Sequence, residues 1–135
     1  MCKQSSTWPP VPASLTPILA WVRECLTRFG VANQTVQQLT LISEEVVVNS
    51  INYAQADSQS QIELTLAHND DGVLLELADY GKAFNPLETE DPDTDLPLME
   101  REQGGLGIFF VKQIADRVEY RRDDGKNILT VWKEL

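Results

Sequence analysis

The chain has 135 residues, enough for one domain with a real core but too few for two. Eleven basic against twenty-one acidic residues give a net charge of −10, which argues against binding to nucleic acid or anionic membranes, because both require a basic surface. No apolar run is long enough for a membrane span, the N-terminus lacks a signal pattern and the two cysteines lack metal or redox spacing, so we expect a cytoplasmic protein with free thiols.

The first half of the chain predicts a pair of helices. Residues 1–13 carry three prolines and are expected to form an extended lead-in. A helix is predicted to begin near Thr16, a capping residue followed by proline, and to end at Gly30. A second helix is predicted from Asn33 to about Tyr53. Its three consecutive valines would suit a strand, but the segment is long and unpunctuated, and its apolar residues mark one helical face.

The second half predicts strands, a long loop and one further helix. Alternating apolar residues predict a strand over 61–68, and the Asn-Asp-Asp-Gly sequence after it predicts a hairpin turn. The later segments are predicted to be a return strand at 73–80, a long loop at 81–105, a helix at 106–116 and a hairpin with strands at 118–122 and 127–133. We therefore expect an α+β fold: a single domain over residues 1–135, with two layers, a mixed but mostly antiparallel sheet and helices on one of its faces.

The loop at 81–105 is long for so small a domain and holds three prolines and a dense acidic run. Loops of this length are more often functional than idle, so we interpret its main part, about residues 85–105, as a lid over a ligand. A tolerated insertion is the alternative. The acidic run by itself is typical of a solvated loop.

Glu45 and Asn49 lie four residues apart on the second predicted helix, and therefore on one face of it. The Glu45 carboxylate could accept a proton, while the neutral oxygen of Asn49 could bind Mg²⁺, which takes its remaining ligands from phosphates and water. The alternative is a solvated polar stripe on an amphipathic helix. For this pair taken alone the stripe is favoured, because such spacings are common.

Asp79 ends the predicted return strand with the same parity as the apolar residues of that strand, so its carboxylate should point toward the core. A buried carboxylate needs a hydrogen-bond donor, and the amino group of adenine is one; Gly81 would let the backbone approach the flat ring. An aspartate that caps its own turn explains the pattern equally well.

Gly104, Gly105 and Gly107 precede the third predicted helix. Exposed amides at a helix start attract phosphate oxygens, and glycine permits close approach. This is important in a chain of net charge −10, whose phosphate site must be built locally. A plain hinge is at least as good an interpretation, and the segment fits neither a dinucleotide-binding fingerprint nor a P-loop.

The three motifs occur together and in order, and on them the chain resembles the GHKL ATPase superfamily (the Bergerat nucleotide fold), and within it the RsbW-type anti-sigma-factor serine/threonine kinases. The matching segments are 45–49, 79–86 and 104–108, with the closing hairpin at 118–122 and 125–130. The resemblance runs from about residue 12 to the C-terminus. It implies a Bergerat-type two-layer sandwich with a long ATP lid.

The resemblance also implies roles for individual residues. Glu45 would be the general base for the attacking hydroxyl, Asn49 the Mg²⁺ ligand and Asp79 the residue that recognises the adenine amino group. The remaining residues of the motifs would bind the nucleotide: Gly81, Phe84, Gly104, Gly105, Leu106, Gly107 and Thr130. The implied cofactors are therefore ATP and Mg²⁺.

By the same resemblance the protein would be a kinase and anti-sigma factor of a partner-switching system that regulates transcription. It would phosphorylate an anti-anti-sigma STAS-domain protein on serine or threonine, bind a sigma factor in alternation with that protein, and form a homodimer. One alternative is a nucleotide-gated protein that sequesters a sigma factor or another effector with little turnover. A weaker alternative is a detached ATPase domain that phosphorylates itself.

Two positions depart from the family pattern. Tyr53 stands where relatives often have histidine, and Lys112 where arginine is frequent. Neither change removes the implied chemistry. His68 is the only histidine, and no second helical domain exists to present it, so we do not expect a two-component histidine kinase.

Overall fold

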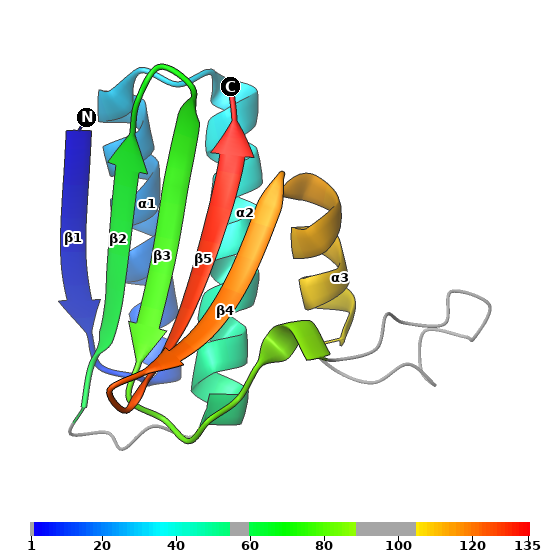
Figure 1. The fold of residues 1–135 in the computed structure, drawn as a ribbon. Helices are drawn as coiled ribbons and strands as arrows, with labels where there is room; N and C mark the ends of the chain where they lie inside the picture. Colours follow the sequence, from blue (N-terminus) through cyan, green and yellow to red (C-terminus); the bar gives the residue numbers. More distant parts are fainter. Residues whose placement is uncertain (1, 55–59, 89–104) are drawn as a thin grey trace.

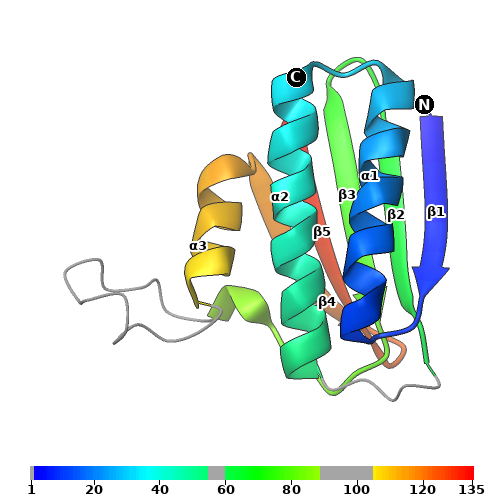
Figure 2. The ribbon, with the colours of Figure 1, turned by 180° about the vertical axis from the view of Figure 1, so that it is seen from behind.

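The computed structural model describes residues 2–54, 60–88 and 105–135, and in them a five-stranded sheet lies against three helices (Figure 1). The strands are β1 (Cys2–Trp8), β2 (Ile62–His68), β3 (Gly72–Asp79), β4 (Arg117–Asp123) and β5 (Lys126–Glu134), and the helices are α1 (Leu15–Phe29), α2 (Asn33–Asn49) and α3 (Gly105–Ile114). The strand order is β1-β2-β3-β5-β4, and every neighbouring pair is antiparallel. The helices lie on one face of the sheet, with α3 beside α2 (Figure 2), so the expected two-layer α+β architecture is confirmed.

The core lies between the helices and the sheet because each element carries apolar residues at the period that places them on one face. On α1 the buried residues Ile18, Val22 and Leu26 recur every four positions, as one helical face requires. The buried apolar residues that alternate along the sheet are Ile62, Leu64 and Leu66 in β2, Val73, Leu75 and Leu77 in β3, and Leu129 and Val131 in β5. Asp79 and Asn127 share this parity, so the fold directs two polar side chains toward the helices at one end of the sheet.

Residues 2–8 form the edge strand β1, where the sequence predicted only an extended lead-in. Each residue of β1 pairs with a residue of β2, from Cys2 opposite His68 to Trp8 opposite Ile62. Most of its side chains are exposed, so the segment shows no alternation of apolar and polar residues. The strand is therefore held mainly by its backbone pairing with β2. Such pairing leaves no apolar period in the sequence by which the strand could be predicted.

The two helices of the first half are confirmed, with ends within two residues of the prediction for α1. This helix ends at Gly30, whose φ of 77° is the left-handed conformation that glycine adopts without strain. After α2 the chain continues as a π-helix at Ser50–Ala54, which covers the predicted end near Tyr53. Within α2, Val46 and Val47 are buried, so core packing outweighs the low helix propensity of valine.

The lid is described only at its start, where Pro86–Glu88 form a short 3-10 helix. The greater part of the predicted lid, residues 89–104, lies outside the described residues, and so does Gly104. In the part of the chain that the structure describes, no helix has both the length and the hydropathy needed to cross a bilayer.

Candidate functional site

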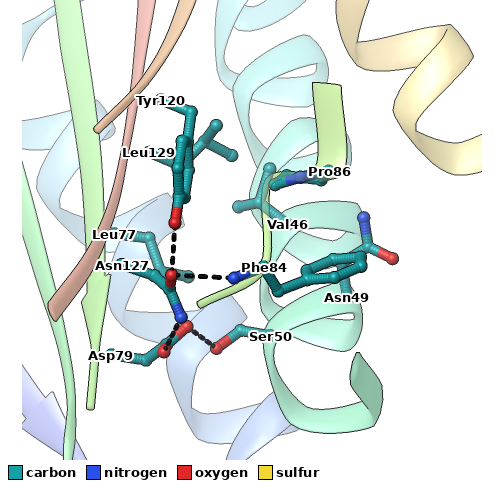
Figure 3. A pocket seen from close by; sticks show the side chains of 10 residues that line it. All are labelled: Val46, Asn49, Ser50, Leu77, Asp79, Phe84, Pro86, Tyr120, Asn127 and Leu129. Atoms are coloured by element: carbon teal, nitrogen blue, oxygen red, sulfur yellow. Dashed lines mark hydrogen bonds between the residues drawn. The ribbon is translucent and has the colours of Figure 1, made fainter. Parts of the chain in front are cut away.

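A pocket opens between α2 and the sheet, at the end where β3 finishes (Figure 3). Its empty volume is about 320 Å³, including the open mouth. The lining residues are Val46, Asn49, Ser50, Leu77, Asp79, Phe84, Pro86, Tyr120, Asn127 and Leu129. The surface of the pocket is thus mostly apolar, with polar groups from both layers: Asn49 and Ser50 from the helical side, and Asp79, Tyr120 and Asn127 from the sheet.

Asp79 is the most deeply buried of the polar residues that line this pocket, with 3% of its surface exposed. The Ser50 hydroxyl donates to its Oδ2 at 2.6 Å, and the Gly81 amide donates to its Oδ1 at 2.9 Å. The expected core-facing orientation is therefore confirmed. The aspartate caps the turn at Gly81, as the alternative interpretation expected, and the same carboxylate lines the pocket; its recognition of adenine stays a prediction.

Asn127 stands opposite Asp79 on β5 and connects the loop after β3 to the sheet. Its Nδ2 donates to Asp79 Oδ1 at 2.9 Å and to the Lys82 carbonyl at 2.7 Å. Its Oδ1 accepts from the Phe84 amide at 3.1 Å and from the Tyr120 hydroxyl at 2.6 Å. Two of these four bonds, to Lys82 and Phe84, hold the loop that forms one wall of the pocket against the sheet.

The sequence analysis did not identify Asn127 as a site residue. One signal was available: Asn127 is a polar residue with the parity of Leu129 and Val131, which are apolar and face the core. A buried carboxamide at such a position requires partners, and the sequence does not show where they are.

Thr130, predicted to assist near the adenine, lies outside the residues that line this pocket, and its role toward the nucleotide stays a prediction. Alternation along β5 turns Asn127 and Leu129 toward the helices and Thr130 toward the other face of the sheet. There Thr130 is opposite Glu76, and its hydroxyl lies 3.4 Å from the Glu76 Oε2. Asn127, and not Thr130, lies beside Asp79.

Gly81 and Phe84 lie in the loop that follows β3, as the second motif predicted. Gly81 is buried, and its carbonyl accepts a hydrogen bond from Arg122 Nη1 at 2.8 Å. The Phe84 ring lines the pocket and stacks on Tyr53, with centroids 5.5 Å apart and planes 22° apart. Tyr53 therefore supports the aromatic wall of the pocket from the π-helix that follows α2.

Glu45 lies against the first turn of α3. A Cβ atom added to Gly107 would overlap the Glu45 carboxylate oxygen, so only glycine fits here without moving that carboxylate. Burial raises the pKa of Glu45 above its ordinary value, and the neighbouring negative charge of Glu44 raises it further. The structure thus brings the first and third motifs into direct contact and favours proton uptake by Glu45.

Asn49 follows Glu45 by one helical turn and lines the pocket with only 7% of its surface exposed. Gly105, Leu106 and Gly107 form the first residues of α3. Within residues 2–54, 60–88 and 105–135, no group of three or more histidine, cysteine or acidic side chains is placed to bind a metal. A divalent cation at Asn49 would depend on oxygen ligands from water and from a bound phosphate, the donor set that Mg²⁺ prefers.

The sequence was compared with protein-family models and with curated proteins. A model described as the histidine kinase-like ATPase domain matches residues 8–133. The serine/threonine-protein kinase BtrW of Bordetella bronchiseptica is 28% identical over 117 residues, which cover 86% of this chain and 82% of BtrW. The serine-protein kinase RsbW of Oceanobacillus iheyensis is 24% identical over 107 residues, covering 76% of this chain and 68% of RsbW.

Two solved structures share the fold. A Mycobacterium tuberculosis protein with RsbU and RsbW domains matches 98% of this chain with a TM-score of 0.71 and 15% identity, and the chain spans 32% of its length. A chain of the SiaB–SiaC complex from Pseudomonas aeruginosa matches with a TM-score of 0.61 and 11% identity, covering 98% of this chain and 89% of that one. At these identities the likeness concerns the fold alone.

Proposed function

Because the chain belongs to the histidine kinase-like ATPase family, we propose that it is a serine/threonine protein kinase and anti-sigma factor of a partner-switching system. In this proposal it transfers the γ-phosphate of ATP to an anti-anti-sigma STAS-domain protein. One contact carries the proposal: the Glu45 carboxylate, with its raised pKa, is held against Gly107 at the start of α3. A proton acceptor is thereby fixed where a helix start favours phosphate.

The pocket supports binding of the purine. Asp79 accepts three hydrogen bonds, from Ser50, Gly81 and Asn127, and a carboxylate has about four acceptor positions, so one position remains for the adenine amino group. The apolar walls formed by Val46, Leu77 and Leu129, and the aromatic ring of Phe84, suit a flat heterocycle.

The phosphates would extend from the purine toward α3. Gly105, Leu106 and Gly107 begin that helix, and the first amides of a helix are free to bind phosphate oxygens. Asn49 would hold Mg²⁺, which when bound neutralises charge on the phosphate oxygens. Local amides and one cation suffice for this, so the net charge of −10 does not oppose it.

In the proposed transfer, the hydroxyl oxygen of the acceptor forms a bond to the γ-phosphorus, and its proton passes to the Glu45 carboxylate. The bond from the γ-phosphorus to the oxygen shared with the β-phosphate breaks, and ADP leaves with that electron pair. This reaction requires alignment and charge neutralisation more than covalent catalysis. A raised pKa at Glu45 is suited to it, because a base works best when its pKa lies near the working pH.

The relatives support a protein substrate. BtrW is named a serine/threonine-protein kinase and RsbW a serine-protein kinase. The SiaB–SiaC structure is a complex of two proteins. We therefore infer that the acceptor hydroxyl belongs to a protein that also competes for this chain with its regulatory target.

Radiolabelled ATP and each purified STAS-domain protein of the source organism test the proposal, with Glu45→Gln as the variant. We expect label on one STAS-domain protein with the wild-type chain and at least about a hundredfold less with Glu45→Gln, at unchanged ATP affinity. Equal transfer by both chains would sink the proposal. ATP-dependent binding of a protein without any transfer would instead support the alternative, a nucleotide-gated sequestering protein.

We also propose that two copies associate. In the described part of the chain β1 is an edge strand, with β2 on one side and no strand on the other. It carries Lys3 but no acidic residue. Such an edge offers backbone N–H and C=O groups to a second chain, and the lack of carboxylates on it limits the repulsion between two chains of net charge −10. Sedimentation equilibrium should give a dimer for the wild-type chain and a monomer for Ser5→Asp; a wild-type monomer at every concentration would contradict this.

A further inference from the structure

Four large apolar side chains are exposed in the described part of the chain: Leu41, Tyr80, Phe110 and Leu135. Two of these lie close to the proposed base. Leu41 precedes Glu45 by four residues on α2, and Phe110 follows Gly107 by three residues on α3. Leu41 is 41% exposed and Phe110 45% exposed, so each presents a large part of its side chain to solvent.

The contact between Glu45 and Gly107 fixes where these two side chains lie relative to one another. Helices α2 and α3 lie side by side and run in opposite directions (Figures 1 and 2). Leu41 therefore lies about 6 Å from Glu45 along the axis of α2, and Phe110 lies about 4.5 Å from Gly107 along the axis of α3. Both displacements point in the same direction from the contact. Leu41 and Phe110 are thus exposed apolar side chains on the same side of that contact, and we call them the α2–α3 patch.

The patch is also partly ordered. The Phe110 ring packs against Phe109, with centroids 6.0 Å apart and a tilt of 59°. Phe109 is itself partly buried, which restrains both rings. An exposed aromatic side chain that is held in place loses little entropy when a protein covers it, and such residues are frequent anchors of interfaces.

We propose that the α2–α3 patch is the docking surface for the phosphate-accepting protein, which covers it with apolar side chains next to its acceptor serine or threonine. This inference rests on the proposed kinase function. The accepting hydroxyl must reach the Glu45 carboxylate, which is half-buried between α2 and α3. A protein that delivers the hydroxyl there must lie on the outer surface of these helices, where the patch is one turn away.

Charge restricts the chemistry of this partner. Glu44 and Glu45 are adjacent, and the chain as a whole carries −10. An acidic segment next to the acceptor hydroxyl would be repelled both by these carboxylates and by the phosphates. The docking segment of the partner is therefore apolar and carries no acidic flanks.

Steady-state transfer at saturating ATP tests the patch, with the purified STAS-domain proteins of the source organism as probes. Leu41→Gln and Phe110→Gln should each raise the KM for the acceptor protein about tenfold or more, with kcat changed less than about twofold, because docking and not chemistry is lost. Leu135→Gln, which removes an exposed apolar side chain elsewhere, should leave both constants unchanged. Unchanged thermal midpoints would show that the variants are folded.

Two outcomes separate failure of this inference from failure of the kinase proposal. If the wild-type chain transfers phosphate and both patch variants keep the wild-type KM for the acceptor, the docking surface is elsewhere. If the wild-type chain transfers phosphate to none of the probes, the kinase proposal is overturned, and this inference with it. A lower kcat at unchanged KM would assign the two residues to alignment of the site, and would equally overturn the docking role.

Discussion

Asp79 and Asn127 face each other across β3 and β5, and the Asn127 carboxamide donates to the Asp79 carboxylate at 2.9 Å. The same carboxamide bonds to the loop after β3 at Lys82 and Phe84. One polar pair therefore joins the sheet to the wall of the pocket. Because both side chains are buried, each depends on the other for hydrogen bonds that water cannot supply.

Replacing Asn127 with alanine should destabilise the protein and weaken nucleotide binding. The change leaves the Tyr120 hydroxyl and the Phe84 amide without their acceptor, and it removes a donor from Asp79. We expect the free energy of unfolding in urea to fall by about 2–4 kcal/mol. Asn33→Ala, at an exposed asparagine on α2, is the control and should change it by less than about 0.5 kcal/mol.

Replacing Asp79 with asparagine should reduce ATP affinity. The carboxamide keeps the shape of the side chain but loses the charge and one acceptor that would serve the adenine amino group. Hydrogen bonds to charged groups contribute about 1.5–3 kcal/mol, so calorimetry should show affinity lower by about tenfold to a hundredfold. Asp116→Asn, an exposed aspartate at the end of α3, should bind ATP as the wild type does. Equal affinity of Asp79→Asn and the wild type would remove Asp79 from the nucleotide site.

Replacing Gly107 with alanine should slow phosphate transfer more than it weakens ATP binding. The added methyl group overlaps the Glu45 carboxylate, which must then move away from its position. A displacement of about 1 Å in a catalytic group can cost about a hundredfold in rate. Gln113→Ala, an exposed position on the same helix, is the matched control for single-turnover measurements. A transfer rate for Gly107→Ala equal to that of the control would show that the contact is not required.

The transfer rate should fall as the pH decreases, and the midpoint of this fall should lie above 4.5, the ordinary pKa of glutamate. Burial raises the pKa of Glu45, so the carboxylate becomes protonated, and unable to accept a proton, at a higher pH than usual. Glu44→Gln removes the second cause, and the acid limb of the rate profile should move to lower pH. It should stay above 4.5, because burial is the larger cause. With Glu119→Gln, an exposed control, the limb should not move.

The same shift in pKa predicts an effect on stability. The folded protein holds the Glu45 proton more tightly than the unfolded chain does, so ionised Glu45 lowers stability once the pH rises above the unfolded value. Glu45→Gln is therefore expected to raise the melting temperature at neutral pH and to lose this advantage as the pH approaches 4.5. A lower melting temperature for Glu45→Gln at neutral pH would contradict the burial of this carboxylate.

Replacing Gly72 with alanine should destabilise the fold without a direct effect on the site. A Cβ atom there would lie 2.5 Å from the Lys133 carbonyl oxygen and 2.6 Å from the Trp132 ring, so β3 and β5 would have to separate. Overpacking of this kind costs about 1–3 kcal/mol, which thermal unfolding can measure. Asp70→Ala, in the exposed part of the same hairpin turn, is the control. Saturating ATP should restore part of the lost stability, because a ligand stabilises only the folded state.

Much of the fold could be predicted because its signals are local. The apolar periods of α1 and β2 follow directly from the requirement that one face of each element be buried. Parity along β3 was enough to orient Asp79 toward the core. The edge strand β1 was missed because its side chains are exposed on both faces, and so no apolar period marks it.

The site itself was predicted in part. Glu45, Asn49, Asp79 and Phe84 were named from their motifs, and the structure brings the last three to one pocket, with Glu45 one turn from Asn49. Thr130 was named from the family resemblance, and the structure turns it away from the pocket because side chains alternate along β5. Asn127 was missed because its partner Asp79 lies 48 residues earlier in the chain.

The sequence by itself determined the order of the elements from α1 onward, the single layer of helices and the residue types available for chemistry, because these depend on local periods and on composition. Only the tertiary structure decided that Gly107 lies against Glu45, that Asn127 and not Thr130 lies beside Asp79, and that the exposed Leu41 and Phe110 lie on the same side of the Glu45–Gly107 contact. Each of these relationships joins residues far apart in the chain. Such pairs are set by strand register and helix packing, which are properties of the whole core and leave no mark at either residue alone.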